Sequence, residues 1–275
     1  MKKDRVSKPI GKIKVRRPDL VYMRNIRLEI EYDGTNYNGW QVQRHNPQAA
    51  SRKCRTIQET IEKVLCKILQ EKVRLIGSGR TDSGVHARAQ VANFRTNSEI
   101  APDKLWKALN GLLPSDIAVT VVEEVPLAFH SRYCAKSKKY RYTILNRRYP
   151  GAIERNFCYF CPYPLDVKSM AKAGRYLRGR HDFSAFRTCD KKKSSSQRTI
   201  KELRVRKERS FIYIDVEADG FLYNMVRSIA GTLIEVGRGK LSALQVKKIL
   251  YKKNRALAGP TAPARGLCLM AVRYK

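Results

Sequence analysis

The order of short hydrophobic patterns along the chain restricts its fold more than any other feature. Apolar residues occupy every second position from Ile26 to Tyr32, which is typical of a half-buried strand. Thr56-Ile-Gln-Glu59 then has the form of a capping box, and the apolar residues after it recur at helical spacing. The rest of the first half predicts strands over 73–76, 89–95 and 117–122, and a short helix that begins at Asp103 and ends at Asn110-Gly111. This order is β-α-β-β-α-β, as in a ferredoxin-like unit.

The second half repeats this order of elements without an obvious repeat of residues. It predicts strands over 138–145, 200–206, 211–218 and 267–274, and helices over 166–179, 221–236 and 242–250. We therefore expect an α+β fold with two ferredoxin-like βαββαβ halves, residues 24–130 and 131–275, after a basic flexible arm over residues 1–23. Two such open sheets can pair along their edges into one long sheet, and its concave face would form a central cleft between the halves.

The connection between the second and third predicted strands is the glycine-rich string Gly77-Ser-Gly-Arg-Thr-Asp-Ser-Gly-Val-His-Ala87. Its glycines make it a poor helix or strand, so we place it on a loop. Asp82 is the one carboxylate in the string, and a nearby cation such as Arg80 keeps a carboxylate ionised at neutral pH. An ionised aspartate can act as a nucleophile or a general base. On composition alone, a turn without chemistry is the competing interpretation.

The charge balance indicates a polyanionic partner. Lys and Arg number 57 against 24 Asp and Glu, a net charge of +33. Neutralisation of nucleic-acid phosphates is the usual reason for such an excess, and basic clusters at 191–193, 201–209 and 247–255 extend it. An acidic membrane surface is the competing partner, but no apolar run approaches the length of a membrane span.

The cysteines and histidines indicate neither disulfides nor a metal site. The chain has seven cysteines, an odd number with irregular spacing, which favours reduced thiols and a cytoplasmic location. Cys158-Tyr-Phe-Cys161 is a lone CxxC pair, whereas zinc sites usually need a second pair. We therefore expect no metal.

The string Gly-Arg-Thr-Asp-x-Gly-Val-His resembles the signature of the TruA-type tRNA pseudouridine synthases, a family in which this Asp is the catalytic nucleophile. Further similarity follows in Asp33-Gly-x-x-Tyr-x-Gly-Trp40, in 182–187 and in 266–274, so the resemblance covers roughly residues 24 to 275. The basic arm, the connection over 44–55 and Ser83, where the family more often has Ala, depart from the pattern. The resemblance implies a pseudouridine-synthase fold with Asp82 as its nucleophile.

Three other residues receive roles from the same resemblance. Tyr140 matches the tyrosine that packs on the target uracil, with a role in moving the C5 proton left open; the alternative is a core aromatic on a strand. Arg227 matches the arginine that pairs with the catalytic Asp; the alternative is a solvated surface arginine. We expect Tyr223, Arg227 and Gly231 to share one helix face. Arg80 matches a residue that holds the nucleotide out of its stack, and a plain phosphate contact is nearly as good an interpretation.

The predicted function is therefore isomerisation of uridine to pseudouridine in the anticodon stem-loop of tRNA, at positions 38 to 40. The N1–C1′ bond breaks, the uracil turns, and its C5 atom bonds to C1′ of the ribose. This isomerisation requires no cofactor. The resemblance also implies a homodimer. Two alternatives remain: a pseudouridine synthase with a different RNA target, and a non-catalytic basic RNA-binding protein of the same fold.

Overall fold

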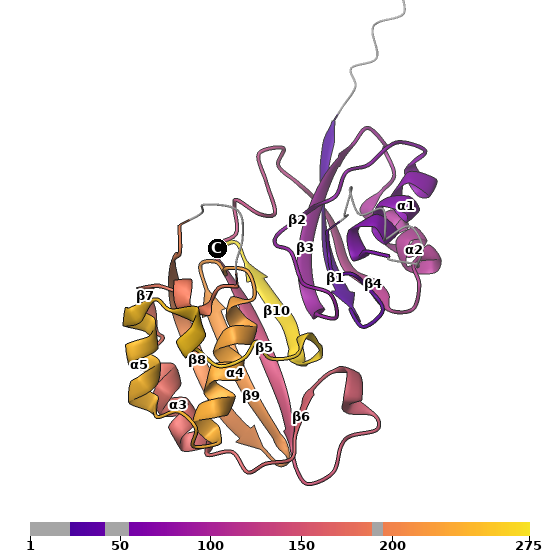
Figure 1. Ribbon diagram of the computed structural model, residues 1–275. Coiled ribbons are helices and arrows are strands. Elements are labelled where there is room, and N and C mark those ends of the chain that lie inside the picture. The colour runs from indigo at the N-terminus through magenta and orange to yellow at the C-terminus, as the bar shows by residue number, and fades with distance from the viewer. Residues whose placement is uncertain (1–22, 42–54, 189–194) are drawn as a thin grey trace, which may run out of the picture.

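The computed structural model describes residues 23–41, 55–188 and 195–275, which form a mixed α+β arrangement around one large sheet (Figure 1). The α+β class is therefore confirmed. The predicted arm over 1–23, the connection over 44–55 and the basic cluster over 191–193 lie outside these ranges, apart from the boundary residues Met23 and Arg55. Within the described ranges, no helix is both long enough and apolar enough to cross a membrane.

The first half has the predicted order of elements. It consists of β1 (Arg24–Tyr32), α1 (Ile57–Leu69), β2 (Ile76–Gly77), β3 (His86–Thr96), α2 (Pro102–Leu112) and β4 (Ile117–Val125). Thr56 begins α1, since its hydroxyl accepts the backbone N–H of Glu59 at 3.3 Å. The alternation along β1 places Ile26, Leu28, Ile30 and Tyr32 in the core, as predicted.

Two boundaries in the first half differ from the prediction. Of the segment predicted as a strand over 73–76, only Ile76 pairs in the sheet. The backbone of Leu75 is satisfied by α1 instead: its N–H donates to the Glu62 carboxylate at 2.8 Å and its carbonyl accepts from Gln58 at 3.1 Å. Helix α2 continues through Asn110-Gly111, because the Asn110 side chain hydrogen-bonds the backbone of Val119 in β4 rather than ending the helix.

The second half contains every predicted element and several short ones that the sequence patterns did not indicate. Its strands are β5 (Ser137–Asn146), β6 (Tyr159–Cys161), β7 (Gly179–Asp182), β8 (Gln197–Glu208), β9 (Phe211–Ala218) and β10 (Leu267–Arg273). Its helices are α3 (Val167–Arg175), α4 (Met225–Gly237) and α5 (Ala243–Lys252), with 3-10 turns at Glu154–Asn156, Ser184–Phe186, Arg255–Leu257 and Ala264–Gly266. The capping box predicted at Ser242 is present, with both reciprocal hydrogen bonds to Gln245.

Helix α4 begins four residues later than predicted. Asn224 has a left-handed backbone (φ 58°), which interrupts the helix expected from Phe221. Asparagine tolerates this conformation better than most residues. Its side chain does not cap the helix but accepts from Arg227 and donates to Thr188. Tyr223 therefore precedes the helix, and its predicted place on one helix face with Arg227 and Gly231 was wrong.

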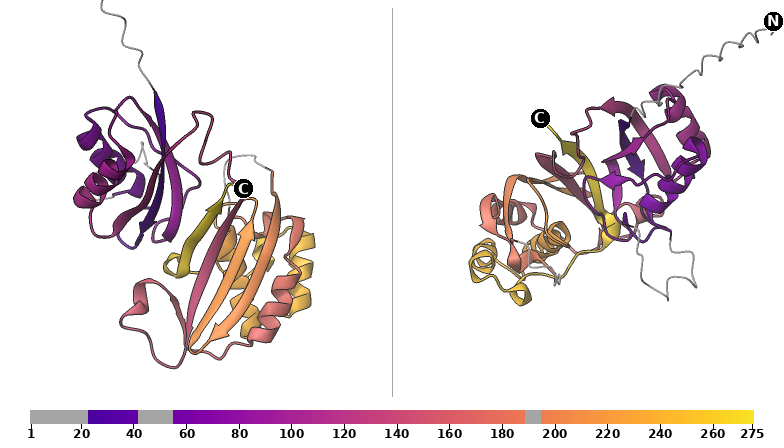
Figure 2. Two further views of the ribbon diagram at one scale, coloured as in Figure 1. Left: turned by 180° about the vertical axis from the view of Figure 1, so that it is seen from behind. Right: turned by 90° about the horizontal axis from the view of Figure 1, so that it is seen from above.

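The sheets of the two halves join into one, as expected from their open edges. The order of strands is β4-β1-β3-β10-β5-β9-β8-β7, with β2 on β3 and β6 on β5. The junction is a short parallel pairing of β3 with β10, through His86 with Cys268 and Ala87 with Leu269. Seen from behind (Figure 2, left), β10, β5, β9 and β8 lie in front of α3, α4 and α5, so these helices cover one face of the second half.

Candidate active site

Asp82 and Arg227 form an ion pair between the two halves of the molecule. Asp82 lies on the connection from β2 to β3, and Arg227 lies in the first turn of α4, 145 residues later. The Arg227 Nη1 atom is 3.2 Å from Asp82 Oδ2. The two side chains are 25% and 18% exposed, so the pair is partly withdrawn from water but still accessible. Such surroundings strengthen the attraction between the two charges compared with full exposure to water.

The Arg227 guanidinium is fixed by its own half. Its Nε atom donates to the carbonyl of Ala262 at 2.8 Å, and Nη1 also donates to Asn224 Oδ1 at 2.9 Å. The Ala262 N–H in turn donates to the Arg227 carbonyl at 3.1 Å. Arg227 is therefore held through its guanidinium and its backbone carbonyl, and it is not the solvated surface arginine of the alternative interpretation.

A close approach of two backbones sets the position of Ala262. A Cβ atom added at Gly231 would lie 1.7 Å from the Pro260 carbonyl oxygen, so only glycine allows α4 to come this near. One residue further along the helix, the Thr232 hydroxyl accepts the Gly259 N–H at 3.0 Å. Gly231 thus brings the 259–262 segment against the helix face that carries Arg227.

The loop that carries Asp82 rests on residues 37–40, the end of the Asp33–Trp40 motif. The Trp40 N–H donates to the Thr81 carbonyl at 3.0 Å, and the Ser83 hydroxyl donates to the Tyr37 carbonyl at 3.0 Å. Gly39 has φ +81°, and a Cβ there would lie 2.4 Å from the Thr81 carbonyl oxygen. The Asp33–Trp40 motif therefore forms the support beneath the aspartate loop.

Buried hydrogen bonds from β1 and β3 hold the other side of the loop. The Tyr32 hydroxyl and Thr81 Oγ1 are 2.8 Å apart. Ser78 Oγ and the Gly79 carbonyl both bond the side chain of Gln90, at 2.6 and 3.0 Å. Each residue adjoining Asp82 is thus fixed, which keeps the carboxylate in one place.

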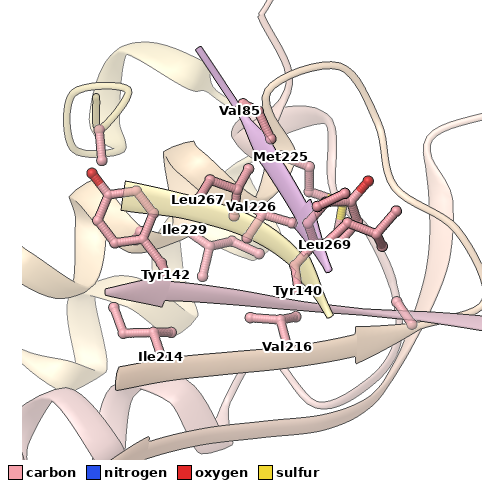
Figure 3. Packing of buried hydrophobic residues seen from close by; sticks show 14 of the residues in the cluster. Val85, Tyr140, Tyr142, Ile214, Val216, Met225, Val226, Ile229, Leu267 and Leu269 are labelled. Carbon is pink, nitrogen blue, oxygen red and sulfur yellow. The ribbon is translucent and has the colours of Figure 1, made fainter. Parts of the chain in front are cut away.

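Tyr140 lies close to this pair and is 7% exposed. Its ring meets Phe221 edge-on, with centroids 5.1 Å apart, and it lies beside Leu269 and Val216 on the neighbouring strands (Figure 3). Burial raises the pKa of its hydroxyl well above the ordinary value, and the charge of Asp82 adds to the shift. Tyr140 is therefore neutral at physiological pH, and it is both a core aromatic and a neighbour of the carboxylate.

Arg80 forms no ion pair with Asp82 within the described structure, although only two residues separate them. Its side chain is exposed, and its Nε atom donates to Gln41 Oε1 at 3.1 Å. The cation that pairs with Asp82 is Arg227, which comes from the other half. The structure therefore brings Asp82, Arg227 and Tyr140 together and leaves Arg80 at the outer surface of the loop.

The CxxC thiols are buried and protonated. Cys158 donates to the Glu154 carbonyl at 3.1 Å, and burial raises the pKa of both the Cys158 and Cys161 thiols. Throughout the described part of the chain, no group of three or more His, Cys, Asp or Glu side chains is placed to hold a metal ion.

A family model described as tRNA pseudouridine synthase matches residues 29–134 and 173–275, which is more than half of the chain. The chain belongs to the tRNA pseudouridine synthase family. The matched segments contain Arg80, Asp82 and Arg227, whereas Tyr140 lies between them. The resemblance read from the glycine-rich motif is thereby confirmed.

Individual members of this family are similar over almost the whole chain. The tRNA pseudouridine synthases A of Thermoanaerobacter sp. (strain X514) and Acetivibrio thermocellus are each 48% identical over 252 residues, which covers 92% of this chain and 100% of theirs. The protein of the same name from Ruminiclostridium cellulolyticum is 50% identical over 254 residues, with the same coverage. A crystal structure of a Cbf5-Nop10-Gar1 complex matches with a TM-score of 0.34 and 13% identity, over 89% of this chain and 58% of that one.

Sequence reasoning missed the residues that position the pair. Asn224, Ala262 and Gly231 hold Arg227, and no local pattern distinguishes them from ordinary helix and loop residues. Lys138, two residues before Tyr140 on β5, also contacts the aspartate loop, because its Nζ atom donates to the Ser78 carbonyl at 2.5 Å. Strand alternation could have found it, since residues 138 and 140 share one face of a strand.

Proposed function

We propose that this member of the tRNA pseudouridine synthase family isomerises uridines 38 to 40 in the anticodon stem-loop of tRNA, with Asp82 as the nucleophile. The observation that carries the proposal is the 3.2 Å ion pair between Asp82 and Arg227. A carboxylate that is covered by an RNA base would otherwise tend to become neutral, and the fixed guanidinium opposes this. The ionised oxygen is then available to attack.

The reaction is an isomerisation and is balanced without a cofactor or metal. The N1–C1′ bond breaks, the uracil turns, and C5 bonds to C1′; C5 loses its proton and N1 gains one. Asp82 supplies its oxygen either to the uracil ring or to C1′, and both routes need the same ionised carboxylate. Tyr140 packs against the uracil as a neutral phenol, which its raised pKa supports. A phenolate at Tyr140 is not available to remove the C5 proton.

The site also requires that the uridine leave its stack. Enzymes that act on a base within a helical stem must turn it out first. Arg80 is exposed on the aspartate loop and, among the described residues, donates a hydrogen bond to Gln41 alone, so we assign it the role of filling or bracing the space that the uridine leaves. The contact of Arg80 with a phosphate is the simpler alternative.

The architecture that we propose consists of two ferredoxin-like halves, residues 24–130 and 131–275, which form a pseudouridine-synthase fold with a central cleft. The strand orders support it, because β4-β1-β3-β2 in the first half has the same arrangement as β10-β5-β9-β8 in the second, with the short strands β6 and β7 as additions. Since Asp82 and Arg227 come from different halves, the cleft would lie where the halves meet. The proposal includes a cytoplasmic homodimer that binds one tRNA across both subunits.

Release of tritium from tRNA labelled at uracil C5 tests the function. The wild-type protein is expected to release tritium, and Asp82→Asn is expected to lose release by at least about a thousandfold while tRNA binding is retained. Asp103→Asn, in the first turn of α2 and remote from the site, is the matched control and should keep normal release. Equal release by wild type and Asp82→Asn would refute the nucleophile. Mapping of pseudouridine in the product at single-base resolution then identifies the target uridines.

A further inference from the structure

Lys138 places a partly buried ammonium group against the aspartate loop. It lies on β5, on the same side of the strand as Tyr140, and its Nζ atom donates to the Ser78 carbonyl at 2.5 Å. A Cβ atom added at Gly79 would lie 2.9 Å from the same nitrogen, so the ammonium touches the loop backbone just before Arg80. Lys138 thus crosses from the second half to the first beside the catalytic pair.

This ammonium has no acidic partner in the part of the chain that the structure describes. The neighbouring Lys139, on the opposite face of β5, pairs with Glu202 at 3.3 Å, whereas Lys138 forms no ion pair there. Among the described residues, one hydrogen bond from its Nζ atom is present, the one to Ser78. Burial and, to a smaller extent, the charge of Arg132 together lower the pKa of Lys138 to about 8. A half-buried cation without an acidic partner is costly, and an anion that binds there removes the cost; Arg132 itself is exposed.

We infer that Lys138, with Arg132 beside it, binds a backbone phosphate next to the everted uridine. The inference rests on the proposed function, because it takes the uracil to lie on Tyr140. Residues two apart on a strand are separated by roughly 7 Å, which is about the reach from a base to the phosphates of its own nucleotide. The Ser78 carbonyl holds the ammonium in place before RNA arrives, and the two free N–H donors remain for phosphate oxygens.

The salt dependence of binding distinguishes a phosphate contact from a purely structural contact with the loop. A phosphate contact displaces counterions from the RNA, so its loss lowers the slope of log affinity against log salt by about 0.7 to 0.9. A residue that only holds the loop changes the rate of reaction and leaves this slope unchanged. Binding needs no turnover, and the slope is therefore independent of whether the bound uridine reacts.

The experiment measures binding of an anticodon stem-loop RNA from about 50 to about 200 mM NaCl, together with KM and kcat for tritium release from tRNA. Lys138→Met is compared with Lys139→Met, which removes the adjacent charge on the opposite face, and with Lys138→Arg, which keeps the charge. Thermal unfolding checks that each variant is folded. We expect Lys138→Met to lower the slope by just under one and raise KM by about tenfold, with kcat within about threefold of wild type. Lys138→Arg should restore the slope and Lys139→Met should not change it.

Two results would overturn the inference. An unchanged slope in Lys138→Met, with a fall in kcat, would make Lys138 a positioning residue for the loop. Equal losses of slope in Lys138→Met and Lys139→Met would mean that only general charge is involved. Absence of tritium release from the wild-type protein is a separate outcome that refutes the proposed function; the slope is still measurable in that case and decides the role of Lys138 alone.

Discussion

The two halves share the order of their main strands but differ in the connection between the second and third of these strands, which is β2 to β3 in the first half and β8 to β9 in the second. In the second half, β8 and β9 form a long hairpin, and only Arg209 and Ser210 separate them. In the first half, the corresponding strands are β2, with two residues, and β3, and the connection between them runs from Ser78 to Val85 and carries Asp82. The same position in the fold is a tight turn in one half and the loop that carries the proposed nucleophile in the other.

The junction between the halves explains this difference. β10 pairs with β3 at His86 and Ala87, whereas β2 pairs with β3 at Ala92 and Asn93. One edge of β3 therefore pairs with β2 of the first half along one part and with β10 of the second half along another. Because β10 occupies that edge at His86 and Ala87, the chain between Gly77 and His86 cannot extend the pairing of β2 with β3. The unpaired segment lies next to β10, β5 and α4, which is how a loop of the first half comes to meet Arg227 and Lys138 of the second.

The largest effect is expected from changing the length of the two corresponding connections. A glycine inserted between Gly79 and Arg80 shifts Thr81 away from Tyr32 and Trp40, and so displaces Asp82 from Arg227. Misplacement of a reacting group by about 1 Å costs on the order of a hundredfold in rate, so tritium release should fall at least that much. A glycine inserted between Arg209 and Ser210 is the matched control and should leave release within about threefold. Similar losses from both insertions would contradict the division of roles.

A smaller loss of the tritium-release rate is expected from Gly231→Ala, which disturbs the contacts that position Arg227 in the second half. Gly231→Ala forces Pro260 away from α4 and moves the Ala262 carbonyl off Arg227 Nε. Overpacking of this kind costs about 1 to 3 kcal/mol of stability, and loss of the charged hydrogen bond should lower the tritium-release rate by about tenfold.

Gly111→Ala is the control for that substitution. Gly111 lies in α2 with open space at its Cβ position, so alanine there should raise stability by about 0.5 to 1 kcal/mol and leave the rate unchanged. Chemical denaturation and the tritium assay measure the two effects. A Gly231→Ala protein with normal stability and rate would show that the close approach of 259–262 to α4 has no role.

The pH dependence of Lys138 gives the smallest effect, with opposite signs for folding and for binding. Its pKa in the folded protein is lowered to about 8 from an ordinary 10.5. Between these values the unfolded chain binds more protons, so this residue's contribution to stability rises as pH increases through that range. RNA affinity should instead fall as pH increases through this range, because a phosphate is bound by the charged form of the Lys138 amine. From pH 7 to 9 the wild-type affinity should fall by up to about tenfold more than that of Lys138→Arg, and parallel curves would contradict the inference.

Local patterns in the sequence predicted most of the fold because each needs only a few neighbouring residues. The alternation along β1 and the capping interactions at Thr56 and Ser242 are of this kind. The short extent of β2 was not predictable in the same way. Val73 and Leu75 are buried as a strand pattern requires, but side chains of α1 take the backbone hydrogen bonds of Leu75 that a longer β2 would use.

The site was predictable only in part, because several of its contacts join residues that are far apart in the sequence. The glycine-rich motif predicted Asp82 as a site residue and family resemblance predicted Arg227 and Tyr140, and the structure brings the three side chains near one another. A prediction from local sequence alone continues the helix through Asn224. In the structure the Asn224 backbone is left-handed, and its side chain accepts a hydrogen bond from Arg227 and does not cap the helix. Lys138 carries no signal beyond its place on the strand, since its importance depends on Ser78 in the other half.

The central claim is that a guanidinium from the second half keeps the aspartate of the first half charged and in place. It is tested most directly by the single-turnover rate of tritium release from saturating tRNA in Arg227→Met, with Arg204→Met, an exposed arginine on β8, as the control. We predict that Arg227→Met is slower by about a hundredfold or more, with tRNA affinity within about threefold, and that Arg204→Met reacts at the normal rate. A normal rate in Arg227→Met would contradict the account.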